Sequence, residues 1–158
     1  MRSIKRHVTR IAPVIFTSIP LLLLAGCERA VEETAVYKRT YISVCEDLDT
    51  AAADMEIVIR GAAEPSPDWE RLEGIAESVY KTFSSCTVRM NAVNVPAEYK
   101  AEHKTFTKAL TDGRDAAADV LEAVRTRDCE AVVEAAVKFE EAGRRARAAT
   151  ELLAAAGR

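Results

Sequence analysis

The chain has 158 residues, which suits one globular domain and is too short for several. Acidic residues outnumber basic ones by 25 to 22, so the chain lacks the basic surplus that non-specific nucleic-acid binding requires, and no nucleic-acid partner is expected. Only 6% of the residues are aromatic, and much of the apolar content is alanine, which favours closely packed helices over a sheet.

The first 26 residues have the layout of a secretory signal. Four basic residues open the chain, at Arg2, Lys5, Arg6 and Arg10. Residues 11–25 are then apolar except for one threonine and one serine. A membrane-spanning helix needs about 20 apolar residues, so this shorter run predicts a cleaved signal peptide over residues 1–26. An uncleaved anchor helix is the alternative.

The apolar run ends in Leu24-Ala25-Gly26-Cys27. These four adjacent residues resemble the lipobox of bacterial lipoproteins. The resemblance implies that the peptide before Cys27 is removed and that the Cys27 thiol is acylated, palmitate being one such acyl group. More than one acyl chain would hold the protein at a membrane without a spanning helix. Glu28, rather than aspartate, follows Cys27, which resembles an outer-membrane lipoprotein under Gram-negative sorting rules.

The chain that remains after this processing is strongly acidic. Four of the 22 basic residues precede Cys27, which leaves 18 basic against 25 acidic residues and a formal charge of −7. Such a domain has no reason to lie flat on an anionic lipid surface. Residues 27–36, the lipidated cysteine and a short polar segment, are expected to be a tether that keeps the domain close to the membrane.

Two helices are predicted in the first half of the domain. Apolar residues recur at helical spacing over residues 37–59 and again over residues 69–90. Two prolines in the segment 64–68 cannot lie inside a helix and therefore separate these stripes. Ser66, which is followed by proline, is the expected N-cap of the second helix.

Two further helices are predicted in the second half. The third begins at Pro96, and its apolar stripe runs to Val124 without losing phase at Gly113. A single continuous helix is therefore expected, in which a close helix–helix approach would account for the glycine; a break at Gly113 is the alternative. Asp128 is the expected cap of a fourth helix that begins at Cys129.

Four amphipathic stripes joined by short turns predict an all-α fold, an antiparallel up-down four-helix bundle over residues 37–155. In plan this domain is similar to some secretion-system pilot lipoproteins, which are small disulfide-bearing helical bundles. That similarity concerns architecture and implies no function.

Three cysteines follow Cys27. Folding the first two helices about the proline-containing segment places Cys45 and Cys86 nearly opposite each other, on or beside the apolar stripes. Since an exported chain can keep disulfides, a Cys45–Cys86 bridge is predicted. Cys129 lies at the other end of the bundle, where a small buried side chain is expected and a thiol used for dimerisation is the alternative.

His103 offers an alternative interpretation of the same cysteines. It could share a layer with Cys45 and Cys86, and two thiolates with one imidazole, with Met90 nearby, suit zinc or copper(I). Because an oxidised pair cannot bind a metal, the disulfide excludes this site. A haem with His103 and Met55 or Met90 as axial ligands is a further alternative without a supporting signature. The main interpretation includes no cofactor.

No catalytic constellation is recognisable in the sequence. Ser84 and Ser85 lack a glycine-rich elbow, and glycine-rich phosphate loops do not occur. The predicted function is therefore non-enzymatic: an extracytoplasmic lipoprotein of the cell envelope that binds or supports another envelope protein. Trp69 and Tyr80 on the second helix, with Tyr37 near the tether, are the candidate contact residues.

Overall fold

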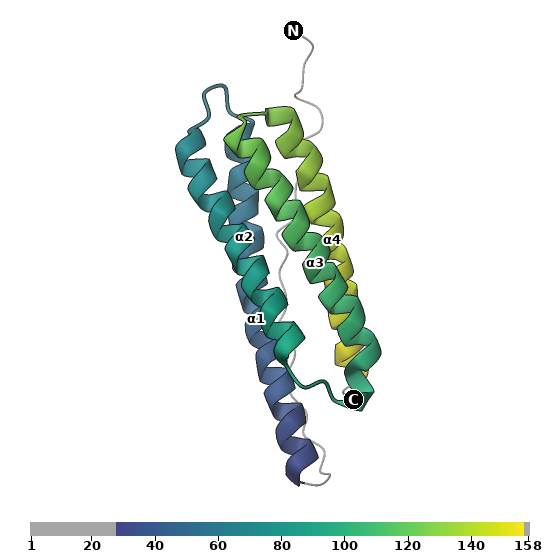
Figure 1. The fold of residues 1–158 in the computed structure, drawn as a ribbon. Helices are drawn as coiled ribbons and strands as arrows, with labels where there is room; N and C mark the ends of the chain where they lie inside the picture. The colour runs from purple at the N-terminus through teal and green to yellow at the C-terminus, as the bar shows by residue number, and fades with distance from the viewer. Residues whose placement is uncertain (1–27, 157–158) are drawn as a thin grey trace.

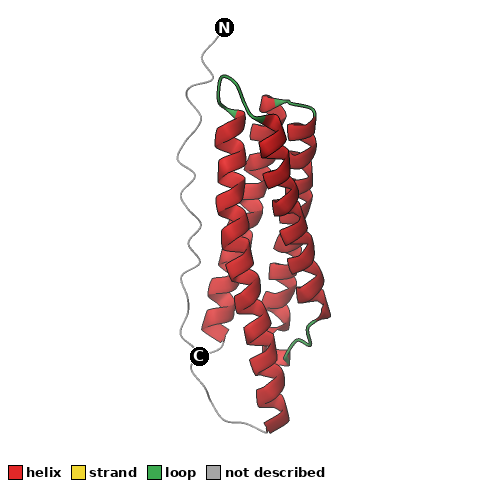
Figure 2. Cartoon of the chain, turned by 90° about the vertical axis from the view of Figure 1, so that its left-hand side faces the viewer, coloured by secondary structure: helices red, strands yellow, loops and turns green. Residues whose placement is uncertain are grey.

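The computed structural model describes residues 28–156, so the predicted signal peptide, the lipobox and Cys27 lie outside the described residues. Within them the chain forms four α-helices and one 3-10 turn, η1 (Figure 1). The elements in chain order are α1 Glu28–Ala62, α2 Trp69–Ala92, η1 Ala97–Tyr99, α3 Lys100–Arg125 and α4 Cys129–Ala156. Residues 28–156 contain no strand, which confirms the all-α prediction (Figure 2).

Helix α1 is the longest, and its first turns extend past the other helices (Figure 1, Figure 2). Because α1 begins at Glu28, the polar segment that was expected to be a tether is helical. No glycine or proline interrupts residues 28–60, which explains the length of the helix. Residues 28–36 precede Tyr37, the first buried side chain described, and rise only about 13 Å along the axis at 1.5 Å per residue.

After both proline-containing connections, the next helix begins later in the chain than predicted. Asp68, rather than Ser66, caps α2, and its carboxylate accepts a hydrogen bond from the backbone N–H of Arg71 at 3.1 Å. Helix α2 begins at Trp69, two residues after Pro67, so Ser66 lies too early in the chain to be the cap. Pro96 precedes the turn η1 and not α3 itself.

The turn between α3 and α4 is closed by Arg127 and Asp128. The Asp128 carboxylate accepts hydrogen bonds from two backbone N–H groups in the first turn of α4, each at 3.0 Å, which confirms the predicted cap. The N–H groups of Arg127 and Asp128 donate to the carbonyl oxygens of Val124 and Ala123, the pattern of a Schellman motif. Arg127 has a φ of 58°, a backbone conformation that glycine adopts without strain.

The helices pack mainly on their neighbours in sequence. The contact between α3 and α4 is the most extensive and α2 lies against both α1 and α3, whereas α1 and α4 touch only sparsely. Contacts between α1 and α2 run in opposite directions along the chain, since Gly61 lies against Leu72 and Asp47 pairs with Arg89. The described residues thus form a helical bundle. None of the described helices has the length and apolar character needed to span a bilayer.

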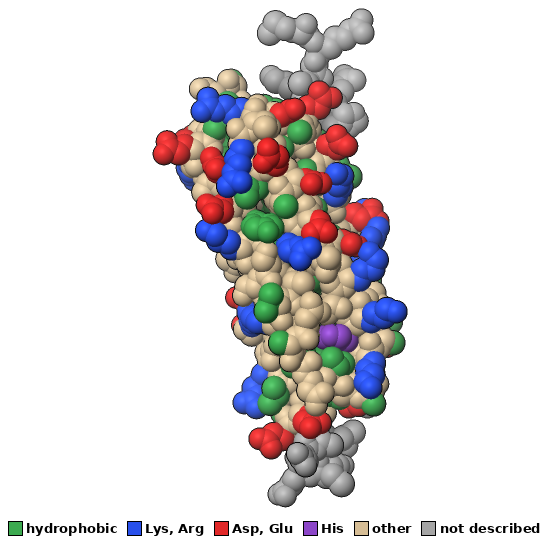
Figure 3. Space-filling model, viewed as in Figure 1, with side chains coloured by type: hydrophobic (Ala, Val, Ile, Leu, Met, Phe, Trp, Pro, Cys, Tyr) green, Lys and Arg blue, Asp and Glu red, His purple; other side chains and the backbone are tan. Residues whose placement is uncertain are grey.

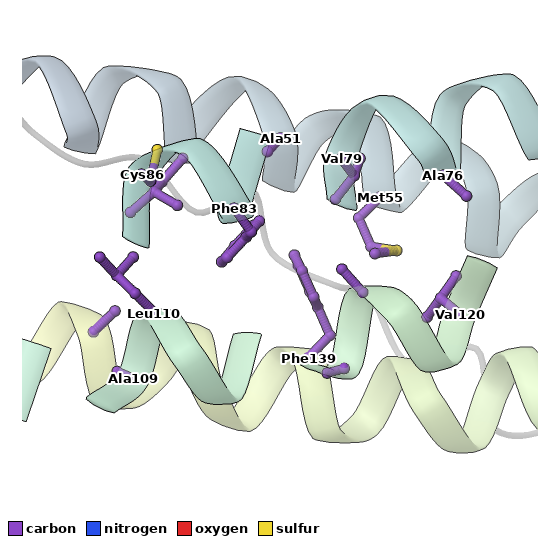
Figure 4. Close-up of a cluster of buried hydrophobic side chains, with 14 of the residues drawn as sticks. Ala51, Met55, Ala76, Val79, Phe83, Cys86, Ala109, Leu110, Val120 and Phe139 are labelled. Carbon is purple, nitrogen blue, oxygen red and sulfur yellow. The ribbon is translucent and has the colours of Figure 1, made fainter. Parts of the chain in front are cut away.

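Helix α3 is continuous through Gly113, as predicted. A Cβ atom at this position would lie 2.6 Å from Cε1 of Phe83, so the absence of a side chain lets the Phe83 ring pack directly on the α3 backbone. Phe83 also packs edge-on against Phe139 of α4, with 5.1 Å between ring centroids (Figure 4). The close approach predicted at this glycine is confirmed, and it joins α2, α3 and α4.

Candidate functional site

Aromatic side chains gather at the end of the bundle beyond which the first turns of α1 project. This base cluster consists of Tyr37, Tyr41, Tyr99, His103 and Phe106. Its members come from α1, η1 and α3, so the cluster joins elements that are far apart in sequence. Three of them are buried, whereas Tyr41 and His103 retain some exposure.

Tyr37 is the centre of the base cluster. Its ring stacks on Tyr99 with 5.4 Å between centroids and 8° between planes, and its hydroxyl lies 3.3 Å from Nδ1 of His103. Burial, followed by the charges of Tyr99 and Glu102, raises the pKa of Tyr37 above its ordinary value, so the hydroxyl stays protonated. Burial also lowers the pKa of His103. At neutral pH a Tyr37 hydroxyl therefore meets an uncharged imidazole.

Tyr41 links the base cluster to α4. Its ring lies 4.7 Å from the Phe106 ring, and its hydroxyl donates a hydrogen bond to Oγ1 of Thr150 at 2.5 Å. The Thr150 hydroxyl donates in turn to the carbonyl oxygen of Ala146 at 3.0 Å. This chain of hydrogen bonds connects α1 and α4, which otherwise touch only sparsely.

Cys45 and Cys86 are free thiols in the structure, so the predicted disulfide is wrong. The sequence argument used the level of each residue along its helix and its place on or beside the apolar stripe. A disulfide also requires Cβ atoms about 3.8 Å apart that point toward each other. Cys45 is buried on α1, with Tyr41, Thr150 and Cys86 among the groups around its thiol. Cys86 is completely buried in the interior of the bundle (Figure 4).

The environments of the described thiols differ. Burial raises the pKa of Cys45 to about 12 and that of Cys86 to about 11, which keeps both thiols protonated and poorly nucleophilic at neutral pH. Cys129 is exposed at the start of α4, so the expectation of a small buried side chain is wrong there. Its alternative, a thiol used for dimerisation, stays a prediction.

The alternative metal site is not assembled. Among the side chains that the structure describes, no group of three or more His, Cys, Asp or Glu residues could hold a metal ion. His103 contacts Tyr37, and Cys45 lies eight residues further along α1, about 12 Å at 1.5 Å per residue. The layer that Cys45, Cys86 and His103 were expected to share therefore does not exist.

The geometry also gives no pair of axial haem ligands. Met55 lies eighteen residues beyond Tyr37 on α1, about 27 Å from the level of His103. Met90 follows Arg89, which binds α1 side chains six and ten residues beyond Tyr37, roughly 9 to 15 Å from that level. Both methionines are core residues, 1% and 0% exposed.

The three aromatic residues expected to form a contact face do not share one surface. Tyr37 is 2% exposed and belongs to the base cluster, so its assignment to an interaction surface is wrong. Trp69 begins α2 near the opposite end of the bundle, and Tyr80 lies eleven residues further along the same helix. Eleven residues are close to three turns, so both lie on one face of α2, where they are half-buried against the core.

A shallow groove between α3 and α4 was not predicted. Its lining includes acidic and basic side chains from both helices: Asp112, Asp115, Asp119, Lys138, Glu141 and Arg145. Lys138 binds Asp119 at 2.9 Å, and Arg145 binds Asp112 at 3.1 Å and Glu141 at 2.7 Å. Asp115 binds Arg114 at 2.7 Å, so each acidic side chain of the lining has a basic partner, and the pairs between α3 and α4 join the two helices. The four-residue spacing of Glu141 and Arg145 predicts the pair within α4, and the structure confirms it, whereas pairs between helices depend on register.

Acidic and basic side chains are also interspersed over the face of the molecule shown in Figure 3.

No protein-family model, curated protein or solved structure matches this chain with significance. The function must therefore be inferred from the residues and their arrangement.

Proposed function

We propose that this protein is a bacterial lipoprotein of the cell envelope, acylated at Cys27 after removal of residues 1–26. The observation that carries this proposal is the sequence Leu24-Ala25-Gly26-Cys27 at the end of a short apolar run with a basic leader. Two or more acyl chains on one cysteine give stable membrane attachment, since each buried methylene contributes about 0.8 kcal/mol. In a Gram-negative envelope, Glu28 directs the protein to the outer membrane.

The start of α1 supports a tether that is rigid and short. Helix α1 begins at Glu28, directly after the proposed lipidated residue, and continues without interruption into the core of the bundle. We take the bundle to be of the antiparallel up-down type, with the α1–α2 and α3–α4 connections facing away from the membrane. The base cluster then lies on the membrane side.

The proposed role is non-enzymatic: the tethered bundle binds or supports another envelope protein. Trp69 and Tyr80 are the proposed contact residues, because half-buried aromatic side chains on one helical face supply rigid contact area. Near them, Arg125 of α3 binds Glu73 of α2 at 2.9 Å, which fixes the two helices relative to each other. A rigid face of this kind needs little ordering when a partner binds.

Metabolic labelling tests the lipid anchor. The full chain is expressed in a bacterial host fed with an alkyne-bearing palmitate, and label is compared between Cys27→Ser and Cys129→Ser. Only Cys27→Ser is expected to lose label and membrane association, because Cys129, although exposed, lies outside the lipobox. Loss of label in Cys129→Ser, or label retained in Cys27→Ser, contradicts the proposal.

Site-specific cross-linking tests the contact face. A photoreactive amino acid replaces Tyr80 in one variant and the exposed Val137 of α4 in the control. The Tyr80 position is expected to give a discrete cross-linked species in the envelope that disappears when Trp69→Ala is added. Identical patterns from the two positions would show that this face of α2 is not the contact surface.

A further inference from the structure

The Tyr37–His103 contact joins α1 to α3 at the end of the bundle where the tether enters. The hydroxyl of Tyr37 lies 3.3 Å from Nδ1 of His103, and the two rings are 5.7 Å apart. Tyr37 is 2% exposed, whereas His103 is partly exposed, and histidine is visible at the surface in the lower part of Figure 3. Solvent protons can therefore reach a side chain whose partner is held inside the core.

Few charges near His103 favour its protonated form. Titratable or charged groups around the contact include Lys38, Tyr41 and Cys45 on α1, Tyr99 on η1 and Glu102 on α3, while on α4 the neutral Thr150 hydroxyl binds Tyr41. Lys38 lies over the Tyr99 ring at 5.7 Å and repels a second cation. His103 is the fourth residue of α3, close to the positive end of the helix dipole. Glu102 is the group that opposes these effects.

We propose that the Tyr37–His103 contact is a pH-dependent latch that closes the base of the bundle when His103 is neutral and releases it when His103 is protonated. With the imidazole proton on Nε2, Nδ1 accepts a hydrogen bond from the Tyr37 hydroxyl. A proton taken up from solvent occupies Nδ1, which can then only donate to the Tyr37 oxygen, so the proton of the buried hydroxyl loses its acceptor and a charge is placed on a partly buried imidazole. Release loosens α1 against η1 and the start of α3.

The direction of the pH effect follows from the burial of His103. Burial lowers the pKa of this histidine in the folded protein, whereas an unfolded chain has an ordinary value of about 6.5. The unfolded state therefore binds more protons as the pH falls through this range, and the latch contributes less stability below about pH 6.5. Most carboxylates are still ionised at pH 5.5, so protonation of His103 can be separated from protonation of the carboxylates. The latch does not depend on acylation of Cys27.

A titration by NMR tests the latch directly. The full chain in mild detergent carries His7→Gln, which leaves His103 as the sole histidine, and its ring signals are followed from pH 8 to 5. The midpoint is expected below 6.5 and should rise in Tyr37→Phe, which keeps the stacked ring but removes the hydroxyl. A midpoint at or above 6.5 that Tyr37→Phe leaves unchanged overturns the proposal.

Amide exchange measures the opening itself. Exchange rates at pH 7.5 and pH 5.5 are compared after correction for the intrinsic rates. Amides around Tyr37 and at the start of α3 are expected to exchange roughly tenfold faster at pH 5.5, whereas amides around Gly113 should be unaffected. His103→Gln provides the matched control, because its side-chain oxygen can accept from Tyr37 but does not titrate. Equal acid opening in His103→Gln would assign the effect to carboxylates such as Glu102 and reject the latch.

Discussion

The base cluster and the middle of the core are packed on different principles. Around Gly113 the helices approach closely because a side chain is absent, and the Phe83 ring lies directly on a helix backbone. At the base the space between helices is filled by large aromatic side chains whose hydroxyl groups are bonded to His103 and Thr150. The middle should therefore be sensitive to added volume, and the base to lost volume, lost hydrogen bonds and pH.

Phe106→Ala should have the largest effect on the free energy of unfolding. Phe106 is 0% exposed and supports the Tyr41 ring, so its removal leaves a cavity and should cost about 3–5 kcal/mol in a urea unfolding experiment. Val88→Ala, at a side chain that is 68% exposed, should stay within about 0.5 kcal/mol. Equal losses in the two variants would show that the base is not part of the cooperative core.

Gly113→Ala tests the sensitivity of the middle to volume. The new Cβ would meet the Phe83 ring at 2.6 Å, so the variant should lose about 1–3 kcal/mol although alanine favours helix. Gly143→Ala is the matched control, because no heavy atom lies within 4 Å of its Cβ position, and it should gain about 0.5–1 kcal/mol. A Gly113→Ala variant that is stabilised like Gly143→Ala would contradict the close approach.

Tyr41→Phe isolates a hydrogen bond at the base. The ring that packs on Phe106 is kept, while the bond to Thr150 is lost, so the free energy of unfolding should fall by about 1 kcal/mol. Thr150 retains its own bond to a carbonyl of α4, which leaves no unpaired hydroxyl proton. Thr150→Val removes the same bond from the other side, and the double variant should lose less than the sum of the two single losses.

The smallest effect is expected at the far end of the bundle. Arg127→Gly replaces a residue whose φ is 58° and should raise the free energy of unfolding by up to about 1 kcal/mol, because glycine adopts this conformation without strain. The added flexibility of the unfolded chain works in the opposite direction and limits the gain. Thermal unfolding of wild type and variant at one pH measures the difference; a lowered melting temperature would show that the turn holds arginine without strain.

The number of helices and the continuity of each were predictable from the sequence, although the first residues of α1 and α3 and the cap of α2 were not. Periodic apolar residues located the helices, the unbroken phase through Gly113 predicted a single α3, and Asp128 was recognisable as a cap. Properties that depend on how the helices are rotated against one another could not be predicted from the sequence. The rotation and spacing of α1 and α2 leave Cys45 and Cys86 unbridged, and the rotation of α1 buries Tyr37, which the pattern allowed to be exposed.

The candidate site shows the same division. His103 was identified from its residue type, but its partner was not, because the contact with Tyr37 requires the register between α1 and α3. Phe83 could not have been placed on Gly113 from spacing alone, since the two residues lie on different helices. Periodicity gives the angle of a residue about its own helix axis. It does not give the register of a neighbouring helix or the rotation of that helix about its axis.

The order of helix contacts also bears on how the chain folds. Since each helix packs chiefly on the one before it, and the first and last touch sparsely, few contacts require the two ends of the chain to find each other. Low contact order of this kind is associated with folding in microseconds to milliseconds. The chain would thus assemble hairpin by hairpin, with the α3–α4 pair as the largest local unit and the hydrogen bond between Tyr41 of α1 and Thr150 of α4 made last.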